Sequence, residues 1–153
     1  MQRNLRKRSV LELTATAVLL GATSGAALAQ ARPVPAANAI YREASLVRQD
    51  SSDCLNNTVS DSDPSRVGGT VILARNPDGA TIVKVYVTAE PNTKYNLYLK
   101  CVRGLGTITT HDEGEGEGLF YFDAKETGNV ITFDMYPDGA PAGNKFQSVQ
   151  VNY

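Results

Sequence analysis

The side chains best suited to chemistry in this sequence are carboxylates gathered in one short segment. Residues 111–118 read HDEGEGEG and contain Asp112, Glu113, Glu115 and Glu117. Carboxylates this close together can converge on a hard cation such as calcium, which takes about six to eight oxygen ligands. They can equally decorate a solvated turn, where the charges prevent edge-to-edge pairing of strands. The sequence therefore leaves open a calcium site here or no cofactor at all.

The same segment holds His111, the single histidine of the chain. A general base needs a nucleophile and an orienting acid, and Asp112 is a poor orienting acid because neighbouring side chains in a strand point to opposite faces. One imidazole is also too few for a multi-histidine metal centre. The chain has no G-x-S-x-G elbow and no phosphate-binding glycine loop. We therefore expect a surface turn histidine and assign no catalytic residue.

Three tyrosines are candidates for ligand binding. Tyr86, Tyr98 and Tyr121 fall on the polar faces of their expected strands by alternation. Exposed aromatic rings on a sheet can stack against sugars or bind a partner protein. Tyrosine also favours half-exposed sheet positions for structural reasons, where it packs against neighbours across the strands.

The elements that position these residues begin after a segment typical of a secretory signal peptide. Basic residues precede an apolar run of about residues 13–20, and Ala27-Leu28-Ala29 provides a small-x-small exit. We expect cleavage after Ala29, and a secreted or periplasmic protein that is not inserted in the membrane. Losing Glu12 and four basic residues (Arg3, Arg6, Lys7 and Arg8) would make the net charge of −1 more negative, which argues against nucleic acid as a partner.

The two cysteines, Cys54 and Cys101, are expected to form one disulfide, because an exported chain meets an oxidising compartment. Two free thiols are the alternative. Alternation over residues 95–101 places Cys101 on the inward face of a strand, which suits a buried crosslink.

Residues 30–66 have the composition of a polar N-terminal arm or linker, with Pro33, Pro35 and Pro64 along it. Within this arm, Ile40, Ala44 and Val47 lie at helical spacing, which favours a short helix.

From residue 67 to 153 the pattern becomes that of an all-β domain. Turn residues separate about seven strands, the spacing expected of a β-sandwich or barrel. Their apolar positions predict the core, namely Val71, Leu73, Val83, Val85, Val87, Tyr95, Leu97, Leu99, Ile108, Phe120, Phe122, Ile131, Phe133, Val149 and Val151.

Residues 91–99, PNTKYNLYL, resemble the tyrosine corner of fibronectin type III and related immunoglobulin-like modules, and residues 109–122 resemble a hairpin of secreted bacterial β-sandwiches. The resemblance implies a single immunoglobulin-like β-sandwich, in which the Tyr95 hydroxyl would bond back to the chain. It carries no functional residue, because such motifs are structural.

These observations favour an exported, non-catalytic module that binds an unknown protein or glycan. Two alternatives remain. One is a secreted hydrolase or cation-dependent enzyme that uses carboxylates, and the other is a structural component of an envelope or matrix.

Overall fold

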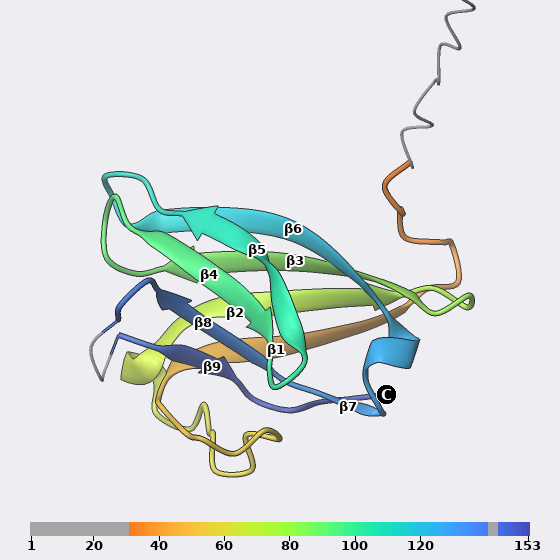
Figure 1. The fold of residues 1–153 in the computed structure, drawn as a ribbon, viewed down its shortest axis with the longest axis horizontal. Helices are drawn as coiled ribbons and strands as arrows, with labels where there is room; N and C mark the ends of the chain where they lie inside the picture. The colour runs from red at the N-terminus through yellow and green to blue at the C-terminus, as the bar shows by residue number, and fades with distance from the viewer. Residues whose placement is uncertain (1–30, 141–143) are drawn as a thin grey trace, which may run out of the picture. The chain divides into compact units, whose positions relative to one another are not determined.

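Strands dominate the computed structural model, which describes residues 31–140 and 144–153. Arg32–Tyr153 form one compact unit, and the expected signal peptide lies outside the described residues. The main sheet has eight antiparallel strands in the order β5-β4-β8-β9-β1-β2-β3-β6 (Figure 1). Its strands are β1 (Ile40–Arg48), β2 (Val67–Arg75), β3 (Ala80–Thr88), β4 (Lys94–Leu99), β5 (Arg103–Thr109), β6 (Glu115–Asp123), β8 (Phe133–Pro137) and β9 (Phe146–Ser148).

A second, two-stranded sheet joins β7 (Val130–Ile131) to β10 (Val151–Asn152). Two short 3-10 helices connect strands, η1 (Pro64–Arg66) and η2 (Ala124–Glu126). The all-β class predicted from the sequence is confirmed. The strands, however, belong mainly to one rolled sheet that approaches a barrel.

The barrel is open along one line, between the edge strands β5 and β6. The turn that joins them holds them together at one end, where the His111 amide donates to the Glu115 carbonyl over 2.9 Å. Near the other end, Arg103 of β5 forms an ion pair with Glu126 and donates to the Tyr121 carbonyl. Between these points β5 pairs only with β4, and β6 pairs only with β3, among the described strands. We call this line the seam.

The first strand is a correction to the sequence analysis. The helix expected over residues 40–47 is wrong, because Ile40–Arg48 form β1, between β9 and β2 in the sheet. The register shifts between Leu46 and Val47, and both side chains are fully buried. This β-bulge interrupts the alternation of inward and outward side chains, so the apolar spacing imitates a helix.

The core lies inside the rolled sheet and agrees closely with the predicted set. All of the predicted core residues are buried except Val149, which packs partly buried against the others. Ala44, Leu46, Met135 and Phe146 complete it.

The structure contains the hydrogen bond to the tyrosine hydroxyl that the resemblance to a tyrosine corner implies. Tyr95 is fully buried, and its hydroxyl accepts a hydrogen bond of 3.2 Å from the Glu90 amide, five residues earlier. This bond fixes the turn before β4, which also contacts the acidic segment through the Asn92 amide and the His111 carbonyl.

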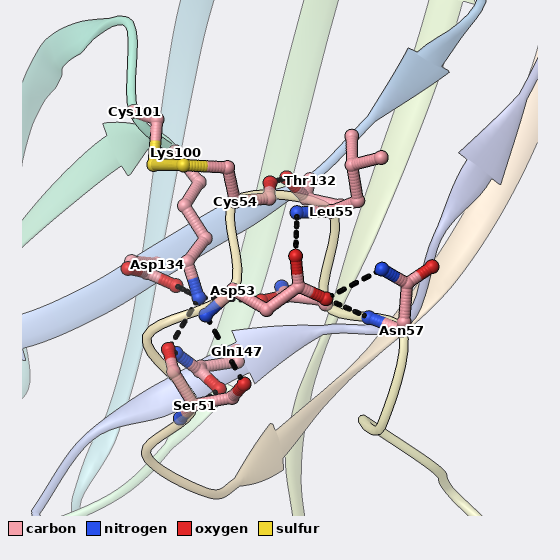
Figure 2. The surroundings of a disulfide bond; sticks show 11 residues. Ser51, Asp53, Cys54, Leu55, Asn57, Lys100, Cys101, Thr132, Asp134 and Gln147 are labelled. Carbon is pink, nitrogen blue, oxygen red and sulfur yellow. Dashed lines mark hydrogen bonds and ion pairs between the residues drawn. A yellow bond between two sulfur atoms is a disulfide. The ribbon is translucent and has the colours of Figure 1, made fainter.

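The predicted disulfide between Cys54 and Cys101 is confirmed, with the two Cα atoms 5.7 Å apart (Figure 2). Its expected setting is wrong. β4 ends at Leu99, so Cys101 lies in the following turn with a positive φ of 57°, and both cysteines are exposed. The crosslink therefore fastens residues 49–63, which we call the disulfide loop, to the outside of the sheet.

The disulfide loop covers an ion pair that the sequence does not reveal. Lys100 is buried, and its Nζ lies 3.3 Å from Asp134 Oδ1. The same ammonium donates to the Ser51 carbonyl at 2.7 Å and to the Asn56 side-chain oxygen. Burial raises the pKa of Asp134 although Lys100 partly opposes the effect. Figure 2 shows Lys100 reaching under the loop toward Asp134 and Ser51.

Candidate functional site

A hollow of about 490 Å³ lies beside the acidic turn, at the closed end of the seam. It is lined by Tyr86, Thr109, His111, Glu115, Gly116 and Glu117, and we call it the acidic hollow. The hollow combines residues from two separate sets of candidates, because Tyr86 was a candidate for ligand binding and Glu115 and Glu117 were candidates for a calcium site that the sequence left open.

Two residues, Thr110 and Gly114, determine the backbone conformation of the acidic turn that borders the hollow. Thr110 is buried, and its hydroxyl donates to the Glu90 carbonyl over 2.6 Å and accepts from the Thr93 amide. Gly114 has a φ of +84°, and a Cβ there would lie 2.3 Å from the Ala89 carbonyl oxygen. Only glycine fits this position, so the acidic residues around it are held on an ordered backbone.

Strand register brings the lining residues together on the outer face of the sheet. Tyr86 of β3 is paired directly with Glu117 of β6 on one side and with Thr70 of β2 on the other. Side chains of directly paired residues share a face, so this row of three forms the polar floor of the region. Tyr86 remains 41% exposed, which leaves its ring accessible.

Lys84 shows how this floor binds a cation. Its ammonium lies 4.6 Å from the centre of the Tyr86 ring and 3.5 Å from a Glu117 carboxylate oxygen. The contact with Tyr86, followed by the charge of Glu117, raises the pKa of Lys84. An aromatic face beside a carboxylate is a combination that attracts ammonium and guanidinium groups.

The carboxylates that the sequence offered as candidate calcium ligands are only partly brought together. His111, Glu113 and Glu115 each offer a ligand atom within 4.8 Å of the other two, whereas Asp112 and Glu117 lie outside this group. The Glu113 amide donates to His111 Nδ1, so the neutral ring carries its proton on Nε2, which faces Glu115 at 3.6 Å. This separation is longer than a hydrogen bond, so the His111 ring and the Glu115 carboxylate are neighbours without a direct hydrogen bond.

The three predicted tyrosines do not form one row. Tyr121 lies on the outer face of β6, near the opposite end of the β3–β6 pair from Glu117. Tyr98 lies on β4, which the strand order separates from β3, and its ring stacks on Tyr136 of β8 with centres 4.8 Å apart.

The outer face that carries Tyr86 and Glu117 turns apolar toward Tyr121. A hollow of about 290 Å³ there is lined by Arg32, Pro33, Val34, Pro35, Tyr41, Ile72, Ala74, Ile82, Lys84, Leu119 and Tyr121. Asn76 holds residues 32–35 against it, accepting from the Ala36 amide and donating to the Val34 carbonyl. The sequence analysis placed this segment in a polar arm, and nothing in the pattern indicated where it packs.

Sequence reasoning missed the seam and the contribution of Thr109. The signal for the seam was present in the glycines of the two edge strands. A Cβ on Gly106 or Gly118 would lie 2.8 or 2.5 Å from the Phe120 ring, so these glycines make room for an aromatic side chain that fills the gap.

Comparison of the chain with protein-family models and with curated protein sequences finds no match. The described residues contain no helix of the length and apolarity needed to cross a membrane. The site must therefore be interpreted from its own geometry.

Proposed function

We propose that this protein is an exported, non-catalytic domain that binds a cationic partner, a protein or peptide bearing lysine or arginine, at the acidic hollow. The observation that carries the proposal is the arrangement of Lys84 between the Tyr86 ring and the Glu117 carboxylate. It is a cation-binding geometry made by residues of this chain, beside further carboxylates that Lys84 does not contact.

The charges around the hollow support this role because they are left in solvent. The side chains of His111, Glu115 and Glu117 are exposed. Exposed carboxylates attract cations at long range and orient them on approach, and this attraction weakens as salt is added.

The proposal also includes export from the cytoplasm and a relationship to immunoglobulin-like domains. The N-terminal sequence pattern and the exposed Cys54–Cys101 disulfide support a secreted or periplasmic location, since disulfides persist in oxidising compartments. The bond from the Glu90 amide to the Tyr95 hydroxyl supports an immunoglobulin-like relationship.

The test is a titration of the purified protein with hexalysine and, as the probe of opposite charge, hexaglutamate. Hexalysine should bind, and more tightly at low salt than at physiological ionic strength. Glu117→Lys should weaken binding about tenfold, since exchanging attraction for repulsion at one exposed site is worth roughly 1–2 kcal/mol.

The matched control is Glu43→Lys. Glu43 is an exposed glutamate on the same outer face, on β1, and is paired with Ile72 rather than with the tyrosine row. It changes net charge equally and should weaken binding by less than about twofold. Equal losses in the two variants would show attraction to overall charge only, and absence of hexalysine binding would reject the proposal.

A further inference from the structure

The hollow of about 290 Å³ on the outer face, which we call the apolar hollow, continues the acidic hollow along β6. Glu117 borders the acidic hollow, and Leu119, two residues further along the strand, borders the apolar one. Residues two apart in a strand share a face and lie about 7 Å apart. Tyr121, which also lines the apolar hollow, is by the same rule about 14 Å from Glu117. One short peptide can therefore reach both hollows.

Lys84 marks the boundary between the two hollows. Its side chain lines the apolar hollow, whereas its ammonium reaches the Tyr86 ring and the Glu117 carboxylate beside the acidic hollow. The aliphatic stem of this lysine thus lies among apolar residues while its charge lies among polar ones. A partner with a basic side chain close to an apolar one would meet the same division of this face.

The residues that line the apolar hollow indicate what it can hold. Among them none is acidic, and the two charged ones, Arg32 and Lys84, are both cations, so a second basic side chain is unfavourable there. Pockets for free small molecules usually measure about 300–1,000 Å³ and contain polar groups that orient the ligand. A hollow at the lower limit of this range, lined mainly by aliphatic, proline and tyrosine side chains, suits one large apolar side chain that its own chain holds in place.

The protein does not itself close the apolar hollow. Residues 32–35 lie along one side of it, and Ile82 on its floor is buried. Leu119, on the neighbouring strand of the same face, remains 47% exposed. An apolar side chain packed against Leu119 would remove surface of both molecules from water, which favours binding.

We infer that the partner bound at the acidic hollow is amphipathic and places a large apolar side chain in the apolar hollow. The inference rests on the proposed function and adds a second requirement to the cationic partner. In an extended segment, an apolar residue two to four positions from the lysine would span the distance of about 7–14 Å along β6. The basic charge would guide the encounter, and the apolar contact would slow dissociation.

The experiment compares three peptides, each acetylated and amidated at its ends. The first is Lys-Lys-Thr-Leu-Thr-Leu, the second has threonine in place of both leucines, and the third has threonine in place of both lysines. The first should bind at least about tenfold more tightly than either of the others, since burial of one leucine side chain is worth at least this factor. In NMR spectra, the methyl signals of Leu119 and Ile82 should shift with the first peptide and not with hexalysine.

Two variants of the protein locate the leucine contact. Leu119→Gln should remove most of the advantage of the first peptide over the second. The matched control is Leu55→Gln, the same change at a leucine that is 45% exposed in the disulfide loop, and it should retain that advantage. Hexalysine should bind equally to both variants.

The possible failures of the inference and of the proposed function are distinguishable. Hexalysine binding without any gain from leucine, or equal losses in the two variants, would overturn the inference and leave cation binding intact. Binding of the third peptide as tightly as the first would also overturn it, because the two contacts would then be independent. Shifts of the Leu119 methyl signals on self-association would assign the hollow to a second copy of the chain instead. Absence of hexalysine binding would reject the proposed function and the inference with it.

Discussion

At one end of β4 the chain is fastened by a disulfide and a buried ion pair, whereas at the other end an acidic turn leaves its charges in solvent. The disulfide loop closes over Lys100 and Asp134. The acidic turn is fixed through its backbone, through Thr110 and through the bond from the Glu113 amide to His111 Nδ1, and we expect the fold not to need its carboxylates. Under the proposed function, this difference places stability and recognition at opposite ends of one strand, and each should be alterable with little effect on the other.

The largest effect should come from removing the disulfide. Cys54→Ala combined with Cys101→Ala should lower the free energy of unfolding by about 2–4 kcal/mol, because the unfolded chain regains the freedom of a long loop. Urea denaturation measures this loss, and hexalysine binding to the folded variant should be unchanged. A variant of full stability would show that the loop is held by its other contacts.

Breaking the buried ion pair should have the next largest effect. Lys100→Met should destabilise the protein by about 2–3 kcal/mol, because it leaves Asp134 mostly buried without its cation. Adding Asp134→Leu to this variant should recover part of the loss. If the double variant were as unstable as the sum of the two single ones, the pair would contribute no coupling.

The pH dependence of stability gives a smaller and more specific test. Because burial raises the pKa of Asp134 above its ordinary 3.8, the folded state binds this proton more tightly than the unfolded state. The contribution of Asp134 to stability is then greatest below pH 3.8 and is lost as the pH rises through the raised value. Asp134→Asn should remove this component, seen by comparing urea unfolding of the two proteins across that range.

The smallest effect is expected at the acidic end. Replacing Asp112, Glu113, Glu115 and Glu117 with their amides should leave the melting temperature within a few degrees, because exposed charges contribute little to stability. We also expect calcium to bind no more tightly than millimolar. A rise of several degrees in the melting temperature at micromolar calcium, lost in the fourfold variant, would contradict both statements and indicate a metal site.

The strands after residue 67 were predictable because each shows the alternation that a half-buried sheet imposes. Val83, Val85 and Val87 were placed inside β3 on this basis, and the structure confirms them. β1 was not predictable by the same rule, since its bulge places Leu46 and Val47 both in the interior.

The candidate site was predictable by composition but not by geometry. The acidic segment stands out in the sequence, yet only the β3–β6 register brings Glu117 beside Tyr86. Lys100 illustrates the limit most clearly. Alternation in the expected strand over residues 95–101 places it on the solvent side, but the disulfide loop from a distant part of the chain covers it.

The pairing of β1 with β9 has a consequence for how the chain folds. Leu46 of β1 lies opposite Ser148 of β9, so β1 cannot complete its pairing until a strand about a hundred residues later in the chain is available. Contacts this distant along the chain slow folding, because a long loop must close before its contacts form. Until residues 146–148 arrive, β1 and β8 lack a shared neighbour and the sheet remains in two parts. The protein should therefore acquire its fold only after residues 146–148 have been synthesised.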